Sequence, residues 1–185
     1  MTETQFVARA LSTDRVAEGK CSWQSPSNIA LVKYWGKTEP QIPTNPSISF
    51  TLNNCHTKTT LHYRRKAKAD ENLSFKVIFE GHPKPEFHPK IEAFLKRILP
   101  YQGFLKDFEF EIHTENSFPH SSGIASSASG MSALALCLMS LEKELDPSIS
   151  ESYFKEKASF LARLGSGSAS RSIEGPLVVW GEHKE

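Results

Sequence analysis

The fold is decided by residues 114–145, which read TENSFPHSSGIASSASGMSALALCLMSLEKEL. Residues 108–112 lead into this stretch with alternating apolar and acidic side chains, which is typical of a strand with one buried face. Glycine, serine and alanine then dominate residues 121–128. Apolar residues recur at helical spacing from Met131 to Leu145. The order of strand, small-residue loop and amphipathic helix predicts a helix N-terminus directly after the loop.

This loop has two interpretations. A helix N-terminus carries unpaired N–H groups and the positive end of the helix dipole, and small side chains let a phosphate approach the backbone. The loop could therefore cradle the phosphates of a nucleotide. Alternatively, the helix simply starts here, with Ser126 or Ser127 as its cap. No Gly-Lys-Ser/Thr follows the glycine, so the loop is not a Walker motif. The loop alone leaves both interpretations open.

Two further stretches favour anions. Residues 33–37 read KYWGK, in which two lysines flank two aromatic residues that could wall a pocket; the alternative is a strand end with solvated lysines. Residues 165–172 read GSGSASRS and place Arg171 among glycines and hydroxyls, which suits a carboxylate or a phosphate. A flexible linker is the alternative there. Together with the loop, these stretches predict two phosphorylated ligands, or one phosphorylated ligand and one carboxylate.

The remaining pattern predicts alternating strands and two more helices. Asn53-Asn54 and residues 80–82 are typical of turns, and Ser148 with Glu151 fits a capping box. Alternation and β-rich composition predict strands over residues 21–32 (broken at Pro26), 47–52, 57–63, 73–79, 108–112 and 176–180. Helical spacing predicts helices over residues 88–99 and 148–164.

Composition excludes several protein classes. The 185 residues carry a formal net charge of +1, so we expect neither nucleic acid nor an anionic membrane as a partner. No apolar run is long enough to span a bilayer, and residues 1–20 form a polar lead-in without the apolar core of a signal peptide. Cys21, Cys55 and Cys137 lack metal-ligand spacing. We therefore expect a cytoplasmic protein with reduced thiols and a loosely held N-terminus.

Four motifs together resemble one known family. Residues 28–37 read NIALVKYWGK, residues 43–49 read PTNPSIS, residues 115–128 read ENSFPHSSGIASSA and residues 165–172 read GSGSASRS. In content and order they resemble the GHMP kinase superfamily and, within it, the diphosphomevalonate decarboxylases. The resemblance implies an α+β fold, with a mostly antiparallel sheet and helices packed on one face. It also implies that residues 21–185 form the N-terminal ATP- and substrate-binding domain of such a protein, without its C-terminal domain.

The resemblance also implies roles for individual residues. ATP and Mg²⁺ are the implied cofactors, and no cluster of metal ligands is predicted. Lys37 and Arg171 are the implied catalytic residues, with Arg171 on the substrate carboxylate. ATP phosphates would be held by Asn116, Gly123, Ala125, Ser126 and Ser127. The substrate would be held by Tyr34, Trp35, Gly36, Lys37, Lys90, Ser166, Gly167, Ser168, Ala169, Ser170 and Arg171.

The implied reaction needs a base that these residues lack. ATP would phosphorylate the tertiary 3-hydroxyl of mevalonate 5-diphosphate, and loss of phosphate and CO2 would give isopentenyl diphosphate. Family members are much longer, and their catalytic aspartate lies in the second half. None of Asp14, Asp70, Asp107 and Asp146 lies in a motif. We therefore expect the isolated chain to be inactive and to expose an apolar face where a second half would pack.

Other functions stay open at this stage. A phosphomevalonate decarboxylase or a mevalonate 3-kinase would keep most of the four motifs. A non-catalytic nucleotide-binding module is compatible with the missing base. In each case the expected partners are small molecules, and a homodimer is allowed for.

Overall fold

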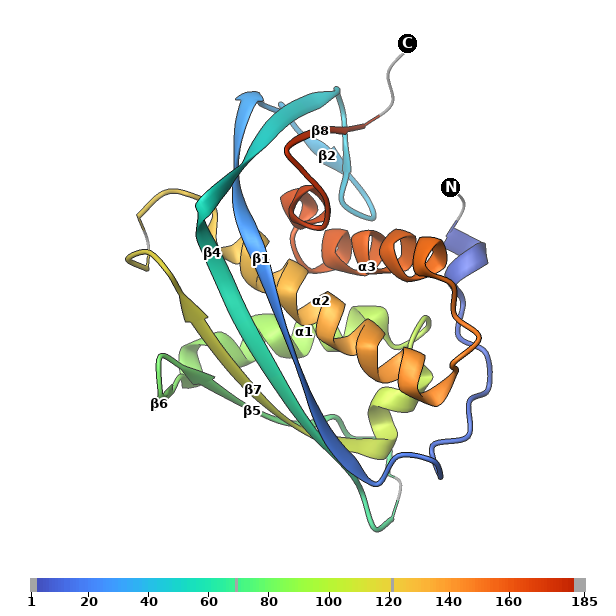
Figure 1. The fold of residues 1–185 in the computed structure, drawn as a ribbon. Coiled ribbons are helices and arrows are strands. Elements are labelled where there is room, and N and C mark those ends of the chain that lie inside the picture. The colour runs from blue at the N-terminus through green and yellow to red at the C-terminus, as the bar shows by residue number, and fades with distance from the viewer. Residues whose placement is uncertain (1–2, 69, 121, 182–185) are drawn as a thin grey trace.

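The main sheet of the molecule is built on two long strands. In the computed structural model, which describes residues 3–68, 70–120 and 122–181, these strands run side by side and antiparallel. Figure 1 shows the sheet with the helices on one face. The strand order is β1 (Glu18–Val32), β4 (Ser47–Arg65), β7 (Phe108–Asn116), β5 (Ser74–Phe79) and β6 (His82–Pro83), with β8 (Leu177–Trp180) also paired to β4. All pairs are antiparallel except β5 with β7.

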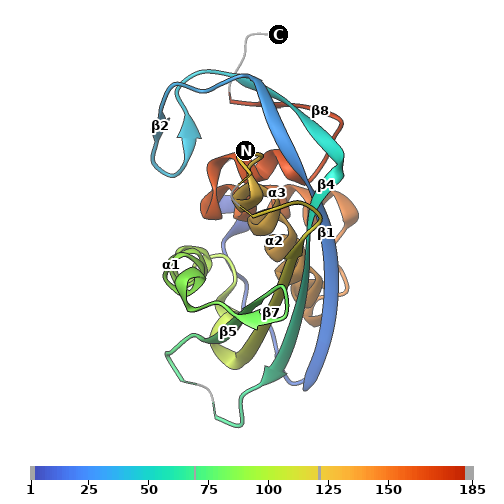
Figure 2. The ribbon, with the colours of Figure 1, turned by 90° about the vertical axis from the view of Figure 1, so that its left-hand side faces the viewer.

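The helices form a second layer on this sheet, as Figure 2 shows from the side. The longer helices are α1 (His88–Ile98), α2 (Ser126–Leu145) and α3 (Glu151–Gly165), and the short 3-10 helices are η1 (Glu3–Phe6), η2 (Pro85–Phe87), η3 (Gly103–Asp107) and η4 (Gly167–Ser172). A separate hairpin pairs β2 (Lys37–Thr38) with β3 (Ile42–Pro43). This mixed architecture confirms the predicted α+β class. No helix within the described residues is both long and apolar enough to cross a membrane.

The predicted turn at Asn53-Asn54 is wrong, because β4 continues through it. Pro26 of β1 lies opposite His56, whereas Ser27 lies opposite Leu52, so residues 53–55 form a bulge without partners on β1. A proline has no N–H to donate, and a bulge is where a strand tolerates that loss. The half of β4 before the bulge pairs with β8, and the half after the bulge pairs with β7.

Helix α2 is central rather than amphipathic. Apolar and small residues are buried all around it, because the sheet covers one side and α3 covers another. The helix also starts differently from the simple capping interpretation. Its N-cap is Ala125, in the left-handed conformation at φ 60°, and no side chain caps the first turn. Ser126 is already the first helical residue, so the prediction of a serine cap is wrong.

The N-terminal segment is held to the core at Phe6, so it is not loose throughout. Phe6 is 1% exposed and stacks on Phe160 of α3 at a ring distance of 4.9 Å.

The start of α3 also departs from the prediction. Its cap is Ser150, whose side chain accepts a hydrogen bond from the N–H of Tyr153, whereas Ser148 donates to Asp146. The predicted capping box at Ser148 is therefore wrong.

Candidate functional site

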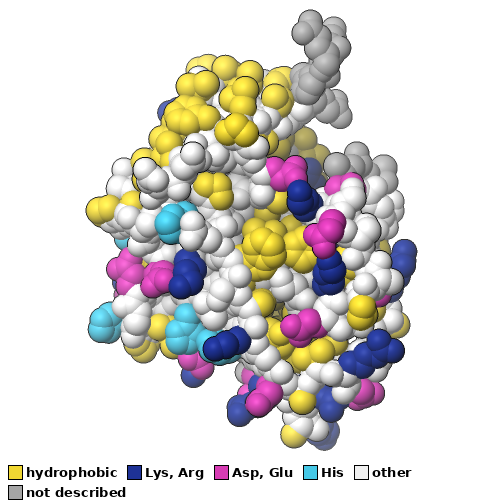
Figure 3. All heavy atoms as spheres, viewed as in Figure 1, with side chains coloured by type: hydrophobic (Ala, Val, Ile, Leu, Met, Phe, Trp, Pro, Cys, Tyr) yellow, Lys and Arg dark blue, Asp and Glu magenta, His cyan; other side chains and the backbone are white. Residues whose placement is uncertain are grey.

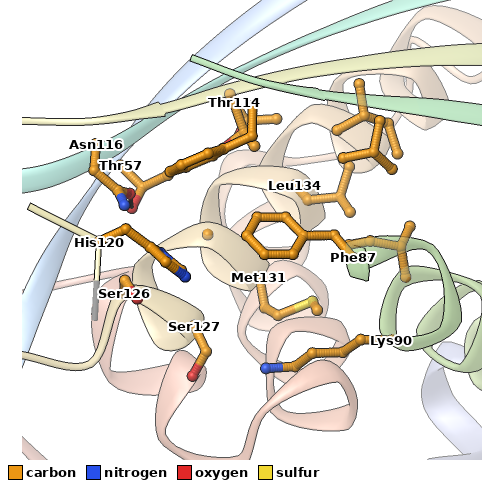
Figure 4. Close-up of a pocket in the computed structure, with 16 residues that line it drawn as sticks. Thr57, Phe87, Lys90, Thr114, Asn116, His120, Ser126, Ser127, Met131 and Leu134 are labelled. Carbon is orange, nitrogen blue, oxygen red and sulfur yellow. Dashed lines mark hydrogen bonds between the residues drawn. The ribbon is translucent and has the colours of Figure 1, made fainter. Parts of the chain in front are cut away.

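A cavity opens between the sheet, α1 and the first turns of α2. Its empty volume is about 650 Å³, which includes space that is open to solvent. Figure 4 shows an apolar end around Phe87 and Leu134 and a polar end around Asn116 and Ser126. The apolar wall consists of Val77, Phe79, Phe87, Ile91, Ile112, Met131 and Leu134. A flat apolar group fits between these side chains, with a polar group at the end where α2 begins.

The start of α2 forms the polar end of the cavity. Ser126 and Ser127 line it, and the N–H groups of a first helical turn have no partner within their own helix. Gly123 (φ 82°) and Ala125 (φ 60°) turn the preceding chain through left-handed conformations. Ser121 lies outside the described residues. This start favours an anion through its free N–H groups and the helix dipole.

Two consecutive residues of β1 join this loop to the η4 segment. The fully buried Ser27 donates a hydrogen bond from Oγ to the carbonyl oxygen of Ile124 in the loop. The next residue, Asn28, donates from Nδ2 to the hydroxyl of Ser172 at 2.7 Å and to the carbonyl oxygen of Ser168 at 3.3 Å. The register shift at Pro26 and Ser27 thus lies where β1 contacts both loops.

Lys90 of α1 lines the same cavity. Figure 4 shows its side chain extending past Met131 toward Ser127. Lys90 is exposed as a residue, yet protein atoms around its ammonium group lower its pKa by desolvation. Neither a hydrogen bond nor an ion pair is recorded for it within residues 3–68, 70–120 and 122–181. The structure therefore groups Lys90 with the loop residues, close to any phosphate held at the start of α2.

A second polar cluster surrounds Arg171. This arginine is 3% exposed, and its Nη1 donates to the hydroxyl of Ser47 at 2.6 Å. Its guanidinium lies 5.4 Å from the ring centre of Trp180, while its Nε is buried without a partner. No ion pair to a carboxylate is recorded for it in the described part of the chain. Desolvation lowers its pKa, and Tyr34 acts in the opposite sense. A buried cation in this state favours an anionic ligand.

The KYWGK stretch meets this cluster through Tyr34 and Lys37. The Lys37 ammonium lies 5.4 Å from the centre of the Tyr34 ring and donates to Gln41 Oε1 at 2.8 Å. Tyr34 contacts Trp180 edge to face at 4.9 Å. Trp180 in turn packs so closely on Gly167 that an added Cβ there would lie 2.6 Å from the indole. The two stretches predicted to bind the substrate are therefore adjacent.

Other residues named for the substrate site lie differently. Trp35 projects into solvent and is 89% exposed, unlike Tyr34, which contacts Trp180. The carbonyl oxygen of Gly36 is occupied by Thr44, whose N–H donates to it at 2.9 Å. Ser170 donates to the carbonyl oxygen of Gly167 at 3.1 Å. The remaining members of the GSGSASRS stretch have the following positions: Ser166 precedes η4, Ser168 lies within it and Ala169 is fully buried.

Sequence reasoning gave no role to several residues of these two sites. Ser47 and Asn28 stand inside quoted motifs, so motif membership was the available signal for them. Trp180 had no signal beyond its place at the end of a strand. Thr57 lines the cavity opposite Asn116 of β7, a pairing that the sequence pattern did not predict.

The acidic residues lie away from both sites. Asp14 and Asp70 are exposed and bonded to Arg65 and Lys66, Asp146 is half-buried and accepts from Ser148, and Asp107 lies at the end of η3. No group of three or more His, Cys, Asp or Glu residues that could hold a metal occurs in the described ranges. The oxygen donors at the polar end of the cavity are instead the hydroxyls of Ser126 and Ser127. These donors suit a magnesium ion only if phosphate oxygens supply most of its ligands.

An apolar surface adjoins the Arg171 cluster. Hydrophobic side chains gather at the upper end of the molecule in Figure 3, over β2 and β8. Six of the eight large hydrophobic side chains exposed in the described residues belong to it: Leu31, Val32, Trp35, Ile42, Leu177 and Val179. We call these six residues the apolar patch. It agrees with the expectation of an exposed apolar face.

Comparison with known proteins identifies the relatives of this chain. A family model described as the diphosphomevalonate decarboxylase-like N-terminal domain matches residues 25–185. Among curated proteins, the diphosphomevalonate decarboxylase of Ganoderma lucidum is 34% identical over 170 residues. That match covers 84% of this chain and 40% of the relative, so the chain spans less than half of the length of this protein.

Solved structures give the same result. The mevalonate diphosphate decarboxylase from Staphylococcus aureus superposes with a TM-score of 0.71 at 33% identity, over 89% of this chain and 46% of that one. A structure described as MDDEF in complex with MVAPP, AMPPCP and magnesium matches with a TM-score of 0.68 at 32% identity, over 89% of this chain and 46% of its own. The neighbours thus share both fold and sequence with this chain.

Proposed function

The chain belongs to the diphosphomevalonate decarboxylase-like N-terminal domain family, and on this premise we propose that it binds ATP and mevalonate 5-diphosphate as part of a decarboxylase. The complete reaction converts mevalonate 5-diphosphate and ATP into isopentenyl diphosphate, ADP, phosphate and CO2. The chain supplies the residues that hold and orient the two phosphorylated ligands.

ATP occupies the cavity at the start of α2. Its flat base fits the apolar end between Phe87, Met131 and Leu134, and its phosphates lie at the first turn of the helix. The groups that hold those phosphates are Asn116, the backbone from Gly123 to Ala125, and Ser126 and Ser127. The hydroxyls of Ser126 and Ser127 would help to hold Mg²⁺, which would supply neutralisation of the phosphate charge.

Mevalonate 5-diphosphate lies in the Arg171 cluster. Arg171 holds its carboxylate, and Lys37 with Tyr34 lies beside its reacting centre. Lys90 lines the nucleotide cavity, where its ammonium group contacts the ATP phosphates and the substrate diphosphate that approaches them. These cations offset the repulsion between two polyphosphates that must approach each other.

The chemistry proceeds by phosphoryl transfer and then elimination. The tertiary 3-hydroxyl attacks the γ-phosphorus of ATP, and ADP leaves. The new phosphate group then departs with the C–O bonding electrons. The electrons of the C–C bond to the carboxylate form the double bond, and CO2 is released. Arg171 holds the carboxylate so that this bond is aligned with the departing phosphate. A carboxylate base outside the two sites described here accepts the hydroxyl proton.

One observation carries the proposal. Arg171 is buried without a carboxylate partner, Ser27 of β1 bonds to the phosphate-type loop, and the next residue, Asn28, bonds to the segment that carries Arg171. A structural arginine would be paired within the protein, because an unpaired buried cation is costly. A binding arginine instead leaves donors free for a ligand.

We further propose that a second half, equivalent to the remaining length of the relatives, covers the apolar patch and supplies the base. The isolated chain would then bind both ligands without turnover. A cytoplasmic location is proposed because the three cysteines are unpaired. A homodimer stays a prediction.

Product analysis tests the proposal. The chain joined to such a second half is given Mg-ATP with mevalonate, its 5-phosphate or its 5-diphosphate in turn, and the 185-residue chain is assayed in parallel. We expect ADP and CO2 only with the diphosphate and only from the longer protein. CO2 from the 5-phosphate would instead identify a phosphomevalonate decarboxylase, and ADP without CO2 would identify a 3-kinase. ATP binding without any product would identify a non-catalytic module.

A further inference from the structure

The inner face of the sheet changes character where it forms the floor of the ATP cavity. Along the β4–β7 pair, the deeper inward-facing positions are apolar, with Leu61 opposite Ile112. Nearer to the loop, the pairs become polar: Thr59 lies opposite Thr114, and Thr57 lies opposite Asn116. Thr57 is 2% exposed. Hydroxyls at such positions need hydrogen-bond partners, because burying an unpaired polar group is unfavourable.

The partners of Thr57 form a short relay. Its Oγ1 donates to Oδ1 of Asn116 at 2.7 Å. The same Oγ1 lies 2.7 Å from Oγ of Ser129, which is fully buried on α2. Ser129 Oγ is also 3.2 Å from the carbonyl oxygen of Ser126, at the start of the helix. One hydroxyl of β4 therefore connects Asn116 of β7 to the first turn of α2.

The number of hydroxyl protons limits which of these groups can donate. A threonine hydroxyl has one proton, and Thr57 donates it to Asn116. Ser129 also has a single proton, which it donates toward the carbonyl oxygen of Ser126 at 3.2 Å and shares with Thr57 Oγ1 at 2.7 Å. Asn116 accepts through Oδ1, which leaves both protons of its Nδ2 available. No partner of this nitrogen is recorded among the residues that the structure describes, and Asn116 lines the cavity beside Ser126.

We propose that Thr57 is a positioning residue, whose hydroxyl keeps the Asn116 amide turned so that its N–H groups donate to an oxygen of the nucleotide phosphates. This inference rests on the proposed ATP site. Without the hydroxyl, the amide of Asn116 can rotate by half a turn and present its oxygen to the phosphates, where two acceptors repel each other. Thr57 thereby acts on the ATP phosphates through Asn116.

The test is a set of binding measurements on the chain by titration calorimetry. Thr57→Val removes the hydroxyl and keeps the shape, and Thr57→Ser retains the hydroxyl. The matched control is Thr60→Val, which removes a hydroxyl from the same strand on the opposite face, where it bonds to Ser22 at 2.6 Å. We expect Thr57→Val to weaken ATP binding about 5- to 10-fold, the usual effect of one misdirected hydrogen bond. Adenosine, which lacks phosphates, should bind the wild type and Thr57→Val equally.

A double-mutant cycle separates positioning from a structural effect. In an Asn116→Ala background, Thr57→Val should have no further effect on ATP affinity, because the amide that it orients is gone. Thr57→Ser should bind ATP like the wild type. Equal ATP affinity of Thr57→Val and the wild type would overturn the relay, and so would equal losses for ATP and adenosine. Failure of the wild-type chain to bind ATP at all would overturn the proposed function and the relay together.

Discussion

The ATP cavity and the Arg171 cluster differ in how completely the chain satisfies its own polar groups. Behind the cavity, Ser27, Thr57 and Ser129 are buried and hydrogen-bonded. In the cluster, Arg171 Nε and Asn28 Oδ1 are buried without partners, and the apolar patch lies next to them. These three buried hydroxyls therefore find their partners within this chain. Around Arg171, by contrast, buried polar atoms lack partners among the described residues, as the proposed ligand and second half require.

The largest expected effect comes from Arg171→Met. Removing the guanidinium should weaken binding of mevalonate 5-diphosphate by about 30-fold or more, because one partner of a buried charge pair is worth about 2–5 kcal/mol. ATP affinity should stay unchanged, since the two ends are separate. Titration calorimetry with each ligand measures both.

The matched control is Arg163→Met, which removes another arginine that stacks on a ring, at 5.4 Å from Phe160, and has a buried unpartnered Nε. Arg163 differs because Glu3 lies 3.6 Å away. This control should leave substrate affinity unchanged. If Arg171→Met and Arg163→Met lose substrate affinity equally, then the loss does not come from a specific contact of Arg171 with the substrate.

Gly167→Ala should disturb the substrate end through packing alone. Its new Cβ would lie 2.6 Å from the Trp180 indole, and overpacking of this kind typically costs about 1–3 kcal/mol. We expect a lower midpoint of denaturant unfolding and weaker substrate binding. Gly103→Ala is the control, because nothing lies within 4 Å of its added Cβ. An unchanged midpoint for Gly167→Ala would show that Trp180 moves aside freely.

Lys90→Met should weaken ATP binding about 10-fold at neutral pH, as expected for a charge-assisted phosphate contact. Because desolvation lowers its pKa, Lys90 loses its proton at a lower pH than an ordinary lysine does. ATP affinity of the wild type should therefore fall in the alkaline range, and this fall should be absent in the variant. The stability of the unliganded fold should change with pH in the opposite direction.

That sign follows from proton counting. Between the lowered folded pKa and the ordinary pKa, the unfolded chain binds the extra proton, so the contribution of Lys90 to stability rises with pH. Unfolding measured with and without ATP over this range tests both trends. If unfolding stability depends on pH in the same way in the wild type and in Lys90→Met, with and without ATP, then Lys90 has neither of these two effects.

The smallest effect is expected for Trp35→Ser. Because Trp35 is 89% exposed, its replacement should change the free energy of unfolding by no more than about 0.5 kcal/mol. Binding of a hydrophobic dye should nevertheless decrease, because the apolar patch becomes smaller. A large loss of stability would mean that Trp35 packs within this chain rather than awaiting a second half.

Local patterns were sufficient for much of this fold. Alternation predicted the strand at residues 73–79, β-rich composition predicted the one at 176–180, and helical spacing with Pro100 predicted α1. The small-residue loop before α2 was visible as a strand-loop-helix sequence. These features depend on neighbouring residues, whose periodicity reflects which face is buried. The same patterns failed at Asn53-Asn54, because a bulge and a turn use similar residues.

By itself, then, the sequence determined the family motifs, the α+β class and the residue types available for two anions. Only the tertiary structure decided which residues meet. Arg171 bonds to Ser47, 124 positions earlier, and Thr57 reaches Asn116 and Ser129 through the register of β4 with β7 and the packing of α2. The physical reason is that local periodicity specifies faces, whereas long-range partners depend on strand register and helix packing that no single segment encodes.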